Sequence, residues 1–287
     1  MDACSRASRV RPPAADWLAA AGCAKQRTMA YEFLTYEVSD HLAVITINRP
    51  EVRNALHPPA NRELSAAFDA FAADPEAWVA IITGAGDKAF SAGNDLKYSA
   101  AHGMGDMQMG NGGFGGITAR FDLFKPVIAA VNGMALGGGF EIALACDLII
   151  AAEQANFGLP EPRVGLAALA GGMQRLPAMI PPKLAMGMML TGKPISAARA
   201  LQLGIVNEVV PGADLMTAAR RWAGEILECS PLSVRATKQV ALESQGLPLH
   251  EALKKPYALV GALFGSEDMM EGVTAFATKR KPQWKGK

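Results

Sequence analysis

The spacing of apolar and polar residues changes along the chain, from strands alternating with helices to helices alone. Two-residue alternation over 33–48 predicts a β-hairpin, because a half-buried strand turns every second side chain to solvent. Short apolar runs at 79–83, 127–131 and 147–152 predict buried strands. Helical spacing is found over 58–74, from 138 onward, and over 172–180, 183–190, 196–203, 213–227 and most of 234–279. This order predicts an α/β core followed by a helical C-terminal region.

Glycine is unusually frequent, with 29 residues in 287, where about 7% is typical. Seven of them fall within 103–116, which has no periodicity and is predicted to form a mobile surface loop. Residues 110–115 match the dinucleotide-binding spacing G-x-G-x-x-G, but no predicted strand precedes them, so this interpretation is rejected. Three more glycines, 137–139, stand together between a predicted strand and a predicted helix.

Charge and composition exclude several classes of function. The formal net charge is +1 and no basic stripe with interleaved aromatic residues occurs, so nucleic acid is not an expected partner. The uncharged stretch at 126–140 is too short and too rich in glycine to span a membrane. The four cysteines form no CxxC pair and have no histidine at metal-ligand spacing, which predicts no metal site and a cytoplasmic location.

The first 28 residues differ from the rest of the chain, because five Lys or Arg against two Asp give them a charge of +3. They can be interpreted as a transit peptide or as residues upstream of a start at Met29. The predicted organisation is a basic extension over 1–28, disordered or dispensable, then a core over 29–228 and a helical region over 229–287.

The glycine triplet is the first feature that indicates chemistry. Glycine removes every Cβ from the turn at 137–139, so a ligand can approach the main chain closely. The following helix begins with unpaired N–H groups and the positive end of its dipole, which suits a developing oxyanion. A second turn of small residues, 91–95, follows a predicted strand and can offer another N–H group. The alternatives are tight helix packing for the glycines and a capping-box role for Glu141.

Two carboxylates accompany these turns. Glu141 lies three residues after Gly138, and Glu161 lies between two prolines that restrict its backbone. Two carboxylates beside an oxyanion hole suit proton transfer next to a polarised carbonyl group.

A hydrolase is the alternative from another class of enzyme. Residues 89–93 are one glycine short of the G-x-S-x-G pattern around a nucleophilic serine, Ser91. Asp147 and His250 follow in the order of a Ser, Asp, His triad. His250, however, opens a helix without a strand end beside it.

At these residues the sequence resembles the crotonase (enoyl-CoA hydratase/isomerase) superfamily, from about Tyr31 to the C-terminus. The resemblance rests on five stretches in a characteristic order: NRPEVRNAL at 48–56, AFSAGNDLK at 89–97, KPVIAAVNGMALGGGFEIALACD at 125–147, FGLPEPRVGL at 157–166 and LTGKPISAARALQLGIVNEVV at 190–210. It implies a spiral of ββα units with C-terminal helices that build homotrimers, often paired into hexamers.

The resemblance also implies roles for individual residues. The backbone N–H groups of Asn94 and Gly138 would form the oxyanion hole, and Glu141 and Glu161 the acid/base pair. The CoA thioester substrate would contact Asn94, Asp95, Leu96, Lys97, Gly138 and, across a subunit boundary, Lys279. No cofactor is implied.

The presence of both glutamates favours reversible hydration of a 2-enoyl-CoA. Within the family, GGFGGIT at 112–118, GGGFE at 137–141 and RLPAMIPP at 175–182 look similar to the carnitinyl-CoA dehydratase branch. A 3,2-enoyl-CoA isomerase of the same superfamily and a catalytically silent CoA-binding member remain as alternatives.

Overall fold

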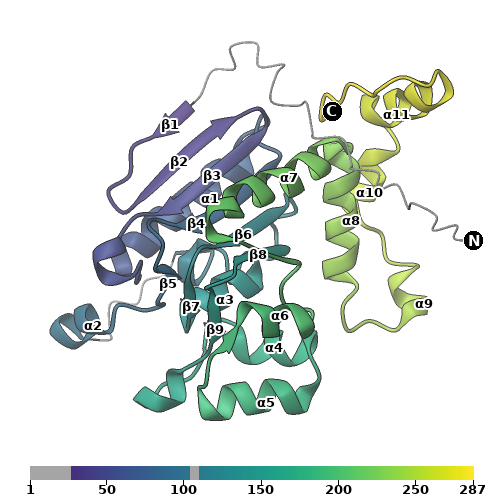
Figure 1. Cartoon of the computed structure of the whole chain (residues 1–287). Coiled ribbons are helices and arrows are strands. Elements are labelled where there is room, and N and C mark those ends of the chain that lie inside the picture. The colour runs from purple at the N-terminus through teal and green to yellow at the C-terminus, as the bar shows by residue number, and fades with distance from the viewer. Residues whose placement is uncertain (1–26, 104–109) are drawn as a thin grey trace, which may run out of the picture.

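The computed structural model describes residues 27–103 and 110–287, which form two β-sheets with helices packed around them (Figure 1). The larger sheet contains, in spatial order, β1 (Arg27–Met29), β2 (Leu34–Ser39), β3 (Leu42–Ile47), β4 (Val79–Gly84), β6 (Val127–Val131), β8 (Leu148–Ala152) and β11 (Glu208–Val210). The smaller sheet contains β10 (Ile195–Ser196), β9 (Asn156–Gly158), β7 (Met134–Leu136) and β5 (Ala89–Ser91).

The chain winds as a spiral in which each turn adds one strand to each sheet and then a helix. The three turns are β4, β5 and α2 (Leu96–His102), then β6, β7 and α3 (Gly138–Ala145), then β8, β9 and α4 (Gly172–Met179). Strands of successive turns pair in parallel in both sheets. The predicted spiral of ββα units is therefore present.

Helices cover both faces of the larger sheet, which explains why its central strands read as continuous apolar runs. In β4, Ala80 and Ile82 pack into the cluster that contains α1 (Pro58–Ala73). The alternate residues Val79 and Ile81 pack on the other face, in the cluster that contains α7 (Leu215–Leu227). This two-sided burial fixes β4, β6 and β8, from which the chain passes directly into the strands of the smaller sheet.

The glycine-rich segment differs from its prediction. Residues 104–109 lie outside the described residues, but Gly112 and Phe114–Gly116 are buried rather than exposed. Gly115 N–H donates to Asn61 Oδ1 of α1 at 2.7 Å. A Cβ on Gly116, whose φ is +69°, would lie 2.5 Å from the backbone nitrogen of Ser65. These glycines allow close packing on α1, so the prediction of a surface loop was wrong for this part.

The first strand begins at Arg27, inside the predicted extension, of which residues 1–26 are not described. Arg27 and Thr28 pair with β2 opposite Val38 and Glu37. The Arg27 guanidinium also forms an ion pair with Asp74 at 2.6 Å. The structure therefore joins at least two residues of the predicted extension to the sheet.

The remaining helices lie mainly after the core strands. They are α5 (Pro182–Thr191), α6 (Ala197–Gln202), α8 (Pro231–Glu243), α9 (Leu249–Ala252), α10 (Ala258–Leu263) and α11 (Glu267–Ala277), with short 3₁₀ turns at Pro50–Val52, Phe114–Gly116, Glu161–Val164 and Gly212–Asp214. Helices α8 to α11 stand to one side of the core (Figure 1). Lys238 of α8 joins them to it through an ion pair with Asp147 at 2.7 Å. None of the helices in the described residues is long and apolar enough to cross a membrane.

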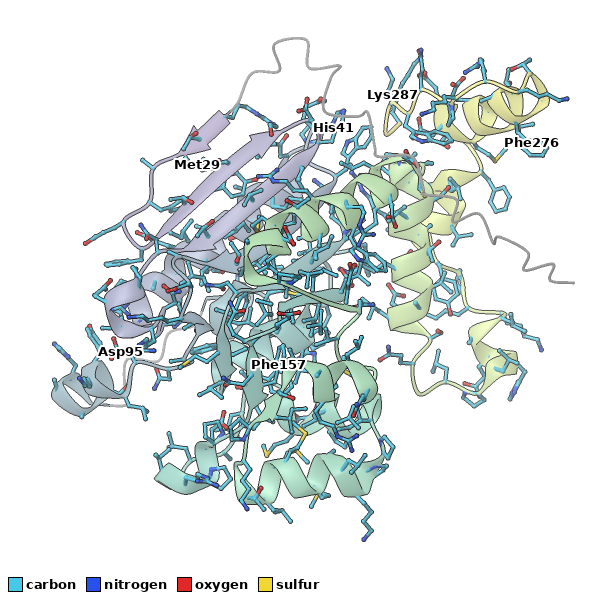
Figure 2. All side chains as sticks on the ribbon, viewed as in Figure 1. Met29, His41, Asp95, Phe157, Phe276 and Lys287 are labelled. Carbon is cyan, nitrogen blue, oxygen red and sulfur yellow. The ribbon has the colours of Figure 1, made fainter. Side chains whose placement is uncertain are left out.

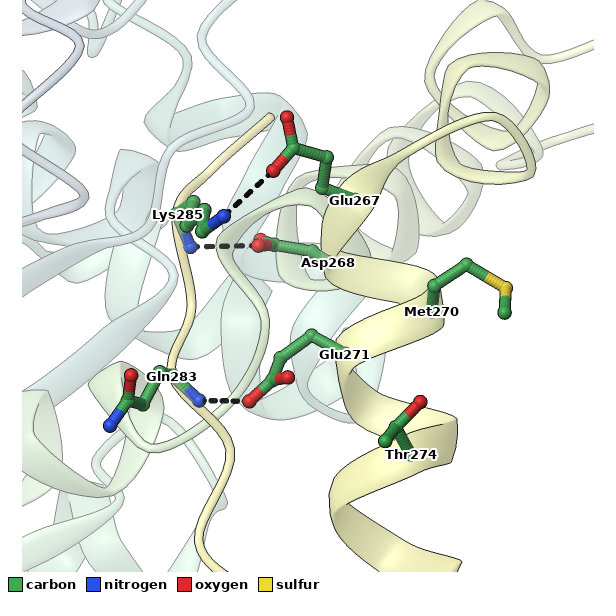
Figure 3. A pocket seen from close by; sticks show the side chains of 7 residues that line it. All are labelled: Glu267, Asp268, Met270, Glu271, Thr274, Gln283 and Lys285. Atoms are coloured by element: carbon green, nitrogen blue, oxygen red, sulfur yellow. Dashed lines mark hydrogen bonds and ion pairs between the residues drawn. The ribbon is translucent and has the colours of Figure 1, made fainter.

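The last ten residues run back along α11 and are held there by its carboxylates (Figure 3). Glu271 accepts hydrogen bonds from the Arg280 guanidinium and from Gln283 N–H, the latter at 2.7 Å. Asp268, which is buried, accepts one from Lys285 N–H at 2.7 Å. The acidic residues of α11 therefore have internal partners.

Candidate active site

Three of the predicted site residues follow neighbouring parallel strands of the smaller sheet. Asn94 follows β5, Gly138 follows β7, and Glu161 follows β9. The C-terminal ends of parallel strands meet at one edge of a sheet. The β7–β9 ladder also continues past its last pair, since Gly137 N–H donates to the carbonyl of Gly158 at 2.9 Å. The topology therefore brings these three turns together.

The N–H group of Asn94 is oriented by a single parallel bridge to Leu56. Leu56 N–H donates to the Gly93 carbonyl at 2.7 Å, and Asp95 N–H donates to the Leu56 carbonyl at 3.0 Å. In a parallel bridge the residue between these two partners directs its own N–H to the opposite side. Asn94 N–H therefore points away from Leu56 and is available for a ligand.

The N–H group of Gly138 lies next to this turn. Gly138 is the first residue of α3, so no intrahelical carbonyl accepts from it. A Cβ on Gly93, whose φ is +85°, would lie 2.8 Å from Gly138 N. A Cβ on Gly139 would lie 2.1 Å from the Ser91 carbonyl oxygen. The glycines thus permit both close packing of two turns and access to a backbone donor.

Glu141 stands in the first turn of α3 and is only 3% exposed. Its Oε1 accepts a hydrogen bond from Gly172 N–H at 2.8 Å. Burial raises its pKa to about 7, and the Glu161 carboxylate raises it too, against the lowering effect of the Gly172 hydrogen bond and of Arg175. The capping-box alternative fails, because no side chain caps α3 and the N–H of its N-cap residue, Gly137, bonds to Gly158.

Glu161 is the first residue of the 3₁₀ turn Glu161–Val164. A Cβ on Gly137 would lie 3.2 Å from Glu161 Oε1, which places this carboxyl beside the start of α3. Its Oε2 is buried and has no hydrogen-bond partner among the described residues. Burial raises the pKa of Glu161 above its usual value. A partly desolvated carboxyl oxygen without a protein partner is suited to exchange a proton with a ligand.

The other predicted CoA contacts are arranged differently. The Asp95 carboxylate faces inward, where it accepts from Tyr98 N–H at 3.1 Å and pairs with Arg49 at 3.1 Å. Leu96 and Lys97 are exposed at the start of α2. Lys279 follows α11, which lies across the molecule from α2 (Figure 1), and Figure 2 shows the same separation between Asp95 and Phe276. One chain therefore does not bring Lys279 to the site.

The triad required by the hydrolase alternative is not assembled. Ser91 is fully buried, and its hydroxyl donates to the Asn54 carbonyl at 2.8 Å and accepts from Gly93 N–H at 3.1 Å. His250 is exposed on α9, and Asp147 is paired with Lys238. Ser91 therefore supports the turn that carries Asn94.

Within residues 27–103 and 110–287, no group of three or more His, Cys, Asp or Glu could hold a metal ion.

Two buried asparagines that sequence reasoning did not single out position this turn. Asn54 Nδ2 and Asn132 Nδ2 both donate to the Ala89 carbonyl of β5, at 2.8 and 3.0 Å. Asn54 adopts a left-handed φ of +54°, which asparagine tolerates better than most residues. The available signal was the position of each asparagine in a motif, at 54 in NRPEVRNAL and at 132 after β6.

Comparison with known proteins decides the family. Residues 37–287 match the enoyl-CoA hydratase/isomerase family. The chain belongs to this family. A carnitinyl-CoA dehydratase of Salmonella enteritidis is 45% identical over 249 residues, which cover 85% of this chain and 94% of that protein. The crotonase fold and the predicted enzyme class, an enoyl-CoA lyase, are confirmed at the level of the enoyl-CoA hydratase/isomerase family.

Solved structures of the family give the same result. An enoyl-CoA hydratase of Mycobacterium tuberculosis superposes with a TM-score of 0.83 at 40% identity, covering 89% of this chain and 99% of that chain. An enoyl-CoA hydratase of Bacillus anthracis superposes with a TM-score of 0.84 at 35% identity, covering 89% and 100%.

Gly139→Ala tests the contact between the two turns. Because its Cβ would lie 2.1 Å from the backbone oxygen of Ser91, the turns must separate, and we expect a loss of about 2–4 kcal/mol in the free energy of unfolding. Gly187→Ala in α5 is the control, since no atom lies within 4 Å of the added Cβ and alanine favours a helix. Urea unfolding of both variants measures the difference, and equal stabilities would contradict the packing.

Proposed function

We propose that this protein is an enoyl-CoA hydratase, which adds water reversibly across the 2,3 double bond of a 2-enoyl-CoA thioester. One observation carries the proposal: the buried carboxyl group of Glu141 and the half-buried one of Glu161 lie beside the adjacent backbone donors Asn94 and Gly138. Membership of the family supports this assignment. The proposed chemistry uses only side chains, backbone N–H groups and water, so it requires no cofactor.

The proposed oxyanion hole activates the thioester. The N–H groups of Asn94 and Gly138 donate to the thioester oxygen, which gains negative charge as water adds to C3 and the bond order of C2–C3 falls. Each such donor contributes on the order of 3 kcal/mol to transition-state stabilisation. Because both donors belong to the main chain, the side chain at position 94 is free to vary.

The two glutamates divide the proton transfers. In hydration, the Glu141 carboxylate takes a proton from water as its oxygen bonds to C3, and the Glu161 carboxyl gives its proton to C2. The substrate thereby gains a hydroxyl group at C3 and a proton at C2, and the second proton of the water, left on Glu141, returns to Glu161 before the next turnover. Dehydration runs the same steps backwards, so both directions need one proton on the pair.

A carnitinyl-CoA dehydratase is the second candidate, because curated relatives with that name are 45–46% identical to this chain. It would use the same site, with a trimethylammonium group on the carbon next to C3. A silent CoA-binding member is disfavoured, since both carboxylates are present beside the turns, Glu141 buried and Glu161 half-buried. The free thiols Cys146 and Cys229 fit a reducing, cytoplasmic location.

Glu161→Gln tests the mechanism. Without an acid to protonate C2, kcat is expected to fall at least about a hundredfold, while circular dichroism and assembly stay unchanged. Turnover is measured by the loss of enoyl-thioester absorbance over short, branched, aromatic and carnitine-derived substrates, which also selects between the two candidates. A near-wild-type rate would refute the assignment.

Two further variants separate the neighbouring activities. Glu141→Gln should also abolish hydration, and 3,2-isomerisation that survived in it would identify the protein as an isomerase.

Ser91→Ala tests the hydrolase alternative. A hydratase releases no free CoA thiol, either as wild type or as Ser91→Ala, whereas a hydrolase would release thiol and lose this activity in the variant.

The pH dependence follows from the raised pKa values. The active pair holds one proton, and it loses that proton as Glu141 ionises at a pKa of about 7. At lower pH, Glu161 also becomes protonated, through its own raised pKa. We therefore expect a bell-shaped profile of kcat with its descending limb near pH 7, with apparent values that belong to the pair. A rate that continued to rise well above pH 7 would contradict this assignment.

We propose that the active form is a homotrimer or a dimer of trimers in which Lys279 of one subunit reaches the CoA phosphates bound to another. The C-terminal region supports this, because it exposes large apolar side chains, among them Leu253 at 78%, Phe264 at 72% and Phe276 at 88%. Lys279 itself is exposed at the end of α11 in a left-handed conformation, with φ of +52°.

Lys279→Ala tests this contact. Loss of a cation that binds phosphate should raise KM for the enoyl-CoA about fivefold and leave kcat unchanged, since the reacting atoms are remote. Lys254→Ala, another exposed lysine of the C-terminal region, should leave both constants unchanged. An unaltered KM in Lys279→Ala excludes the phosphate contact, and sedimentation of the wild type reports the assembly.

A further inference from the structure

Arg175 of α4 is a charged side chain that the proposed mechanism does not use. Its guanidinium donates to the Thr118 carbonyl at 2.9 Å and to the Ala170 carbonyl at 3.4 Å. It is half-buried, and burial lowers its pKa, although an arginine stays protonated at any physiological pH. The acidic side chain whose charge acts on it is Glu141, which raises the pKa of Arg175. A desolvated cation is thus held by neutral carbonyl groups close to a carboxylate of the site.

The two carbonyl groups belong to two chain segments that pack on α3. Thr118 lies at the end of the segment 114–118. A Cβ on Gly138 would lie 2.4 Å from the ring of Phe114, so this segment packs directly against Gly138. Ala170 lies just before Gly172, whose N–H donates to Glu141 Oε1. A Cβ on Gly171 would lie 2.1 Å from Arg175 Nη1, so the glycine there leaves room for the guanidinium. Arg175 therefore joins the segment 114–118, which packs beside Gly138, to the loop 170–172, which binds Glu141.

The charges around Glu141 leave Arg175 as its counter-charge. From the neighbouring 3₁₀ turn, Glu161 raises the pKa of Glu141. At Cys146, which directly follows α3, burial raises the pKa of the thiol and keeps it neutral. On the side of Thr118, Arg120 is neutralised by Asp69 at 2.7 Å. Arg175 on α4 acts in the opposite sense to Glu161 and favours the ionised form of Glu141.

We propose that Arg175 is a positioning residue for Glu141. It ties the segment beside Gly138 to the loop that binds the Glu141 carboxyl, and it supplies the positive charge that lets this carboxyl release the shared proton. The proposal rests on the proposed function, because the proton matters for catalysis only if Glu141 and Glu161 exchange it. Without Arg175 the proton stays on Glu141, and the form in which Glu141 is ionised and Glu161 protonated, the one that hydration requires, becomes rarer.

The test is a titration that needs no substrate. The infrared difference between wild type and Glu141→Gln reports the protonated carboxyl of Glu141 as the pH is raised, with a midpoint near 7. In Arg175→Gln the midpoint is expected to rise by about one pH unit, because a nearby opposite charge has been removed. Arg175→Lys keeps the charge but cannot reach both carbonyls, so its midpoint should stay near 7 while kcat falls about tenfold.

Arg120→Gln is the matched control, since Arg120 also ties the Thr118 side of the chain, donating to the Gly116 carbonyl at 2.8 Å, but is paired with Asp69. It should lower stability without moving the Glu141 midpoint. An unchanged midpoint in Arg175→Gln, or an unchanged kcat in Arg175→Lys, overturns the proposal, and the second variant suffices if the first does not fold. A shifted midpoint in a protein that turns over no enoyl-CoA would refute the proposed function alone.

Discussion

The close contact between two turns, made at glycines that have no side chain, is the constraint on which the site depends. One turn follows β5 and the other begins α3, and Gly93 and Gly139 lie where any Cβ would strike the opposite backbone. The contact sets two backbone N–H groups, those of Asn94 and Gly138, side by side. Hydrogen bonds from Ser91, Asn54 and Asn132 hold the first turn from behind, so its geometry is largely formed before a ligand arrives.

Burial affects the two kinds of polar group at the candidate site, the backbone donors and the carboxyl groups, in different ways. For the backbone donors, exclusion of water strengthens any hydrogen bond to a developing oxyanion. For the carboxyl groups, it disfavours the charged form, so both Glu141 and Glu161 bind their protons more tightly than free glutamates do. The backbone hydrogen bonds of Gly172 and Ala170, and then the charge of Arg175, offset part of this effect at Glu141. The balance leaves a pair of acids that can hold a proton near neutral pH.

The rest of the chain supports this edge in separate ways. The larger sheet, buried on both faces, fixes β4, β6 and β8, which lead into the smaller-sheet strands that precede the turns. Helix α1 supports the segment that carries Phe114. The C-terminal helices are joined to the core through the Lys238–Asp147 ion pair and keep much apolar surface exposed. The candidate acid/base groups lie in one chain, whereas Lys279 is remote from them, which is the reason for the proposed assembly.

Local patterns in the sequence determined the order of the main elements, the two glycine turns and the carboxylates of Glu141 and Glu161, because periodicity and missing side chains act over a few residues. They could not reveal β7, β9 or β11, because each of these strands forms only by pairing with segments distant in sequence. Likewise, only tertiary contacts decided that residues 114–116 are buried, that Asp95 faces Arg49, and that the Ser91 hydroxyl is already bonded. The environment of each carboxyl group arises from segments distant in sequence. The affinity of Glu141 and Glu161 for protons was therefore decided by the tertiary structure, although the sequence identified both residues.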